Sequence, residues 1–315
     1  MQAKNIFKFK NACYTTLTIS GIYLTTKIED KNIRMGVTGL LAQVTTDFIF
    51  HPFDLVNTRT KYFFKEKINA LDMSRRIYNT TGITGFLRGA SVTVQGSSFI
   101  GFIYFAFYKK FKEFFHKIFS DENDKEKNSN FLVYTFSALA AELIIYPLYY
   151  PFELIGTRIQ IGKYTYLNFF DGVKTILNKS ERKGLSKIKD LYTGFVSCLF
   201  LSLGSAFLTF ITFEMMRDYF ANKQNIPAEE IKGVQYFLCS FVAGFVKAGS
   251  LNFLEVYSIQ KISLGKEVTF RKFLSLKNLD AMKSGILIKM GSSILYTIFI
   301  LESVNIFGKI YNVNL

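Results

Sequence analysis

Long apolar runs separated by shorter polar connections make up most of this chain of 315 residues. Six runs approach the ~20 residues that an α-helix needs to cross a bilayer. They lie at 35–58, 90–108, 131–152, 195–216, 234–257 and 285–307. One or two charges interrupt most of them, so a soluble protein with unusually long buried helices stays open as the alternative. The pattern predicts an all-α membrane protein with six transmembrane helices.

Two polar connections have a helical period of their own. Segments Leu71–Tyr78 and Phe170–Leu177 place apolar side chains on one helical face, which is typical of short helices that lie along a membrane surface. Each structural unit is therefore predicted to be a span, a surface helix and a second span.

The net charge of +15 would suit nucleic acid if the bases formed one patch. Instead, segments 59–88, 158–190 and 261–283 carry +5, +5 and +4, whereas 109–130 and 217–233 carry +1 and 0. Basic residues gather on the loops of one membrane face in multi-pass proteins. The charge therefore predicts topology, with both termini on the less basic side, and no nucleic-acid partner.

One short motif occurs twice, as HPFDLVNTRTK from His51 and as YPFELIGTRIQ from Tyr150. Each copy holds a proline, an acid two residues later and a base seven residues later: Pro52, Asp54 and Arg59, then Pro151, Glu153 and Arg158. A third copy, LNFLEVYSIQK, keeps the acid as Glu255 and has Phe253 in the place of proline. Since proline removes a backbone donor and bends a helix, the fifth span, which carries this third copy, is predicted to bend less.

Small residues confirm the register of this repeat. They stand ten and thirteen residues before each proline position: Ala42, Ala141 and Ala243, and Gly39, Ala138 and Ser240. Close approach of helices in a membrane requires small side chains at the contact. The chain is divided accordingly into an N-terminal extension, 1–34, and three repeats, 35–125, 126–228 and 229–315.

These motifs, together with GITGFLRG and DLYTG in the basic connections, resemble those of the mitochondrial carrier family. The resemblance covers residues 33 to 310 and implies a pseudo-three-fold bundle of six helices in the mitochondrial inner membrane. It implies that the basic loops face the matrix and that both termini face the intermembrane space. No cofactor is expected, and bound lipid such as cardiolipin is an expected partner.

The resemblance also implies a gate at the matrix side, where each motif acid pairs with a base five residues after a proline position. Those positions hold Asn57, Gly156 and Ser258, so none of the three usual pairs is expected. Arg59 and Arg158 are candidates to reach an acid, and Gln160 is a candidate brace.

An opposite gate is implied on the even-numbered helices. FEMMR supplies Glu214 and Arg217, and Glu302 with Lys112 is the interhelical pair that the family's pattern still permits. Substrate would contact Gly96, Leu201 and Lys289, of which only Lys289 is charged.

Enzyme chemistry has no candidate residues. Cys13, Cys198 and Cys239 lack the spacing of a disulfide framework or a metal site, and no catalytic constellation accompanies them. Because features that build the bundle persist while gate bases are lost, we expect a largely non-transporting accessory subunit of a respiratory-chain assembly, held through the N-terminal extension. The alternative is an active carrier that exchanges a small anionic metabolite by alternating access.

Overall fold

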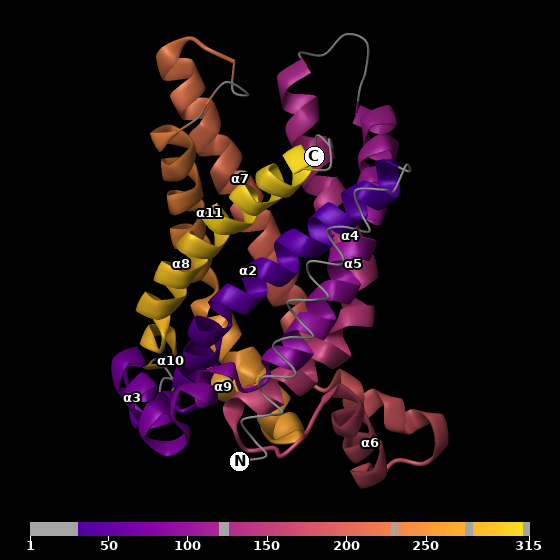
Figure 1. The fold of residues 1–315 in the computed structure, drawn as a ribbon, viewed down its shortest axis with the longest axis vertical. Helices are drawn as coiled ribbons and strands as arrows, with labels where there is room; N and C mark the ends of the chain where they lie inside the picture. The colour runs from indigo at the N-terminus through magenta and orange to yellow at the C-terminus, as the bar shows by residue number, and fades with distance from the viewer. Residues whose placement is uncertain (1–30, 120–125, 228–230, 232, 275–279, 311–315) are drawn as a thin grey trace.

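Six long helices of 25 to 36 residues form the body of the protein in the computed structural model, which describes residues 31–119, 126–227, 231, 233–274 and 280–310. These helices are α2 (Lys31–Tyr62), α4 (Ala90–Phe119), α5 (Glu126–Ile161), α7 (Phe195–Gln224), α8 (Val234–Leu264) and α11 (Ile286–Ile310). Figure 1 shows them running between the two ends of the molecule. No strand occurs among the described residues, so the fold is all-α, as predicted.

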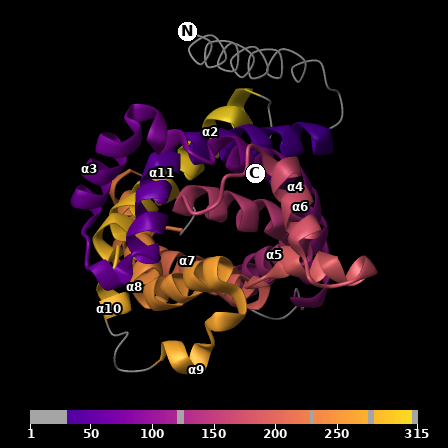
Figure 2. The ribbon, with the colours of Figure 1, turned by 90° about the horizontal axis from the view of Figure 1, so that it is seen from below.

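The six helices close into a ring. Helix α2 packs on α4, α4 on α5, α5 on α7, α7 on α8, α8 on α11, and α11 returns to α2. Figure 2 shows the ring from the end where the short helices lie. Each repeat thus contributes two spans to a closed bundle. Counted along the chain, the odd-numbered spans or helices are α2, α5 and α8, and the even-numbered ones are α4, α7 and α11.

Length and composition suit a membrane. Within the described chain, Thr135–Ile161, Phe195–Gln224 and Val234–Leu264 are long and apolar enough to cross a bilayer, and Ile286–Phe299 is a shorter apolar stretch. Large apolar side chains such as Leu148 and Phe200 are exposed on the outside of the bundle, as expected of a surface that meets lipid.

Short helices connect the two spans of each repeat at one end of the bundle (Figure 1). They are α3 (Ala70–Thr81), α6 (Phe169–Lys179), α9 (Phe270–Phe273) and α10 (Asp280–Lys283), with 3₁₀ turns η1 (Phe64–Glu66), η2 (Ile83–Leu87), η3 (Gly184–Tyr192) and η5 (Gly265–Glu267). Asn69 and Asn168 cap α3 and α6, each by accepting a backbone N–H at 2.8 or 2.9 Å. The short helices predicted between the spans of the first two repeats are confirmed.

Small residues at the repeat positions lie inside the bundle. All six are buried: Gly39, Ala42, Ala138, Ala141, Ser240 and Ala243. Gly244 is equally constrained, because a Cβ there would come 3.2 Å from the Cα of Ile294 in α11. The repeat register read from the sequence is therefore confirmed, including its third copy.

Proline 151 leaves one backbone carbonyl without its helical donor, that of Pro147 one turn earlier. The hydroxyl of Tyr192, in η3, donates to that oxygen at 3.0 Å. A loop side chain thus compensates the hydrogen bond that proline removes from α5. The smaller bend at Phe253 stays a prediction.

A glycine with positive φ precedes each even-numbered span: Gly89 (φ 89°), Gly194 (φ 87°) and Gly285 (φ 66°). Residues with a Cβ rarely adopt this conformation. Gly285 therefore occupies the same structural place in the third repeat as Gly89 and Gly194 occupy in the first two.

Candidate functional site

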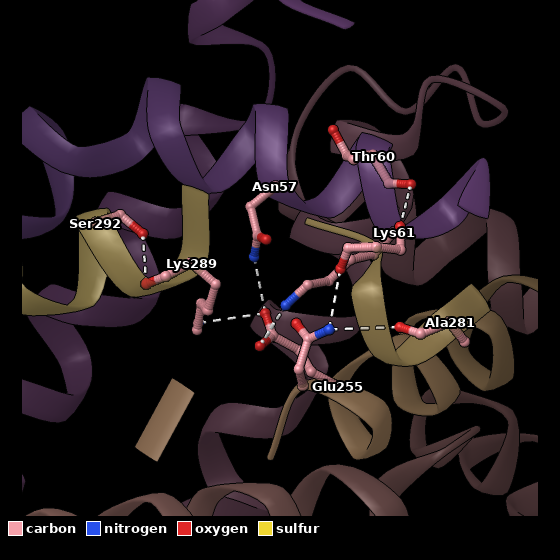
Figure 3. A network of polar contacts seen from close by, with 9 residues as sticks. Asn57, Thr60, Lys61, Glu255, Ala281, Lys289 and Ser292 are labelled. Carbon is pink, nitrogen blue, oxygen red and sulfur yellow. Dashed lines mark hydrogen bonds and ion pairs between the residues drawn. The ribbon is translucent and has the colours of Figure 1, made fainter. Parts of the chain in front are cut away.

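Glu255 lies at the centre of a charged cluster at the end of the bundle where α2, α5 and α8 finish, which we call the motif end (Figure 3). Its carboxylate lies 2.7 Å from Lys61 Nζ and 3.2 Å from Lys289 Nζ. Asn57 Nδ2 donates to the same carboxylate at 2.9 Å. The cluster joins α2, α8 and α11 through one acid, and we call it the Glu255 cluster.

Position 57 holds no base, as expected, but Glu255 has a cation that sequence reasoning did not identify, Lys61. Lys61 follows Asn57 by four residues and so lies one turn further along the same face of α2. A lysine side chain there reaches back to the place of the missing base, and its side chain is 0% exposed. The cation that pairs with Glu255 therefore comes from one helical turn later on α2 than the family's pattern implies.

The other two motif acids, Asp54 and Glu153, form no ion pair among the described residues. Glu153 accepts a hydrogen bond from Tyr146 Oη at 2.5 Å, and the structure shows no hydrogen bond or ion pair for Asp54. Lys289 is nevertheless within electrostatic range of Asp54, Glu153 and Glu255. Of the three motif acids, only Glu255 is paired with lysines, and the described residues do not form a ring of three salt bridges.

The residues seven after the proline positions, two arginines and one glutamine, do not bridge the acids. Instead, each donates to a backbone carbonyl of the next odd-numbered helix. The three contacts are Arg59 Nε to Gln160 O at 2.7 Å, Arg158 Nε to Ile262 O at 3.2 Å, and Gln260 Nε2 to Tyr62 O at 2.7 Å.

This second arrangement follows the symmetry of the fold, because α2 reaches α5, α5 reaches α8 and α8 reaches α2. The last carbonyls of a helix lack helical donors and carry partial negative charge, which explains why guanidinium groups prefer them to the acids. Gln160, expected as a brace, takes part through its backbone oxygen. All three odd-numbered helices are thereby joined at the motif end.

At the opposite end, Arg217 pairs with Glu214 three residues earlier in α7. The two charges thus satisfy each other within one helix, whereas the family's pattern pairs such charges between helices. The Glu302–Lys112 pair stays a prediction, since the side chain of Glu302 lies outside the described residues.

The three expected substrate positions differ in surroundings. Gly96 lies where α4 packs on α5: a Cβ there would come 3.0 Å from Phe152 Cβ. Leu201 is half-buried in α7. Lys289 is 27% exposed and belongs to the Glu255 cluster. Close packing accounts for Gly96, so of the three positions only Lys289 offers chemistry to a polar substrate.

A second polar cluster surrounds Asp47, near the middle of α2. The carboxylate accepts from Gln43 Nε2 at 3.0 and 3.1 Å, from Tyr296 Oη at 2.8 Å and from Ser97 Oγ. We call these four residues the Asp47 cluster. They come from α2, α4 and α11, and no described lysine or arginine forms an ion pair with Asp47.

Sequence reasoning missed Lys61, Tyr146 and the partners of Asp47. A search one turn beyond each lost base finds Lys61. The same search finds no cation in the other repeats, where the equivalent residues are Gln160 and Ile262. The described residues include no group of three or more His, Cys, Asp or Glu side chains placed to hold a metal ion.

A closed ring of apolar helices in three repeats, with charged side chains from different repeats meeting at one end, defines a multi-pass membrane protein of repeat architecture. The sequence profile described as "Mitochondrial carrier protein" matches residues 29–119 and 127–224, more than half of the chain. The chain therefore belongs to the mitochondrial carrier family. Membership implies a multi-pass protein of the mitochondrial inner membrane.

Similar proteins are distant in sequence. Mitoferrin of Dictyostelium discoideum is 25% identical over 41% of this chain and 42% of its own length. Solute carrier family 25 member 33 of Danio rerio is 26% identical over 58% of each chain. Mitochondrial thiamine pyrophosphate carrier 1 of Saccharomyces cerevisiae is 21% identical over 67% of this chain and 71% of its own. The chain thus spans about half the length of the first two relatives.

Proposed function

We propose that this protein is a solute carrier that exchanges a small anionic metabolite across the mitochondrial inner membrane by alternating access. The observation that carries the proposal is the Glu255 cluster. Its ion pairs join three helices at one end of the bundle, and one of its cations stands at the position where the resemblance implies substrate contact.

A gate needs contacts that stabilise one state by a few kcal/mol and can be exchanged for others. A buried ion pair fits this need, because losing one partner costs about 3–5 kcal/mol while the intact pair stabilises little beyond its desolvation cost. Lys61 and Lys289 both contact Glu255. Opening the motif end therefore requires that α2 or α11 move away from α8. Glu255 then loses one of its two cations and needs another partner.

The charge of Lys289 sets the substrate class. Lys289 is partly exposed, whereas Lys61 is fully buried against the same acid. An incoming carboxylate or phosphate can therefore replace Glu255 at Lys289 and leave Glu255 paired with Lys61. Charge-assisted hydrogen bonds of this kind are the strong ones in water-excluded sites. Binding of the anion therefore breaks one of the two ion pairs of Glu255, the one with Lys289, and leaves the other intact.

The hypothesis of a non-transporting accessory subunit rested on counting the lost gate bases. Lys61 reduces that loss, and the contacts of Arg59, Arg158 and Gln260 supply a further set of links between the odd-numbered helices. The relatives that match the chain have the names of carriers, among them a thiamine pyrophosphate carrier. Both points favour transport over the accessory role.

The test is exchange by the purified full-length chain in liposomes preloaded with unlabelled solute. The panel of labelled anions is inorganic phosphate, malate, citrate, glutamate and thiamine pyrophosphate. We expect saturable, protein-dependent uptake of at least one of them. Uptake of none, from a preparation that unfolds cooperatively on heating and that co-purifies with a respiratory complex in mild detergent, would support the accessory subunit instead.

A further inference from the structure

Asp47 is a carboxylate near the middle of a membrane-spanning helix whose hydrogen-bond partners are all neutral. Ionisable residues inside a membrane are costly and mark functional sites by default. The usual structural reason for such an acid is a pairing cation, and the described residues provide none at Asp47. A different reason for its presence has to come from its partners, Gln43, Ser97 and Tyr296.

Counting protons shows that the Asp47 cluster satisfies an ionised carboxylate. Gln43 Nε2 has two hydrogens, one for Asp47 and one for Tyr296 Oη at 2.7 Å. The Tyr296 hydroxyl then donates its own hydrogen bond to Asp47, and Ser97 donates to the second carboxylate oxygen. Each oxygen of Asp47 has donors, and each donor is used once.

The same atoms also satisfy a protonated carboxyl group. Ser97 Oγ lies 2.9 Å from the backbone oxygen of Thr93 as well as next to Asp47. Its single hydrogen serves only one of these acceptors at a time. When Asp47 is protonated, its O–H donates to Ser97 Oγ and the serine hydroxyl turns to Thr93, while Gln43 and Tyr296 stay in place. Neither state leaves a buried polar atom without a partner.

The chemistry of the cluster favours a proton over a metal ion. Gln43, Tyr296 and Ser97 all direct hydrogens toward the carboxylate, whereas a metal ion requires oxygen lone pairs from several ligands. A proton needs only one carboxylate oxygen to bind it and one further oxygen to accept the hydrogen bond of the resulting O–H group. Ser97 Oγ is that further oxygen.

The Asp47 cluster is stacked on the Glu255 cluster along the same two helices. Asp47 precedes the motif acid Asp54 by seven residues on α2, and Tyr296 follows Lys289 by seven residues on α11. Seven residues make two helical turns, about 10 Å. A movement of α11 relative to α2 therefore changes both clusters together.

The titratable groups in electrostatic range of Asp47 come from three helices: Tyr296 on α11, Tyr149 on α5 and Asp54 on α2 itself. Asp54 is in turn within electrostatic range of Lys289 on α11, Glu255 on α8 and Lys61 on α2. Helix α4 contributes Ser97 and has no charged residue between Arg88 and Lys109.

We infer that Asp47 binds a proton and that the carrier moves this proton together with its anion. The inference rests on the proposed function. A proton taken from water on one side converts the Asp47 carboxylate to the neutral acid, and the same proton returns to water on the other side. Neutralising Asp47 removes one negative charge from the path of the anion. The loaded protein therefore changes between its two conformations with one negative charge fewer.

Proton binding is tested without any transport, by infrared difference spectroscopy of the full-length chain in lipid nanodiscs between about pH 5 and about pH 9. We expect a protonated-carboxyl band that grows as the pH falls, is missing from Asp47→Asn, and shifts in frequency in Ser97→Ala. Glu142→Gln is the matched control, because Glu142 is another intramembrane acid that accepts from a serine, Ser202. A band unchanged in Asp47→Asn would overturn the inference.

Coupling is tested in proteoliposomes that contain the pH-sensitive dye pyranine, with malate or inorganic phosphate added outside. We expect internal acidification that follows anion entry in the wild type and in Glu142→Gln. In Asp47→Asn we expect at least tenfold less acidification for each anion that enters. Equal acidification in wild type and Asp47→Asn overturns the coupling. If neither anion enters, the proposed function fails for these anions, while the infrared result still decides whether Asp47 binds a proton.

Discussion

Replacing Lys61 with methionine removes the buried cation of the Glu255 cluster while keeping most of the side-chain volume. Lys61 is 0% exposed and lies 2.7 Å from Glu255. Removing one partner of a buried ion pair costs about 3–5 kcal/mol. Because Lys289 and Asn57 still contact the carboxylate, we expect the lower end, about 3 kcal/mol, or about 5 °C in Tm for a chain of this length.

The thermal unfolding of Lys61→Met is measurable through the chain's own thiols. Cys198 and Cys239 are buried and free, so a fluorogenic maleimide reacts with them when the helices separate. The matched control is Lys223→Met, which removes an exposed lysine at the end of α7 and leaves Tm unchanged.

A double-mutant cycle then separates the ion pair from lost packing. Once Glu255→Gln has removed the acid, Lys61→Met leaves no buried charge unpaired. We therefore expect the double variant to be more stable than the sum of the single effects predicts, by about 1–3 kcal/mol. Strict additivity, or a Lys61→Met protein as stable as Lys223→Met, would refute the assignment of Lys61 to Glu255.

Two further substitutions test the packing of the bundle with the same thiol assay. Tyr192→Phe leaves the Pro147 carbonyl without its donor and costs about 1 kcal/mol; an unchanged Tm would show that this bond is not needed. Gly96→Ala forces a Cβ to 3.0 Å from Phe152 and lowers Tm, whereas Gly291→Ala, with nothing within 4 Å, does not; equal Tm values would contradict the close approach of α4 and α5.

The sequence predicts the scaffold well because each element depends on its own residues or on a repeated pattern. Small residues recur at matching distances before Pro52 and Pro151, and helix contacts require them wherever they occur. Even the third repeat, where Phe253 replaces proline, follows from this register, although the family profile ends at residue 224.

Side-chain partners across helices are less accessible to sequence reasoning. Whether Arg59 meets an acid or a carbonyl depends on how α2 is rotated against α5, which the residues of α2 alone do not specify. Lys61 was missed for a related reason, since a long flexible side chain can serve a position one turn away. Gln43, Ser97 and Tyr296 come from three helices and share no motif.

The charge at position 289 tests the central claim most directly, through the initial rate of anion exchange in proteoliposomes. We expect Lys289→Gln to exchange about 10- to 100-fold more slowly than wild type, the loss associated with one hydrogen bond to a charged group. Lys289→Arg retains most of the rate, and Lys223→Gln retains all of it. Exchange by Lys289→Gln at the wild-type rate would contradict the account.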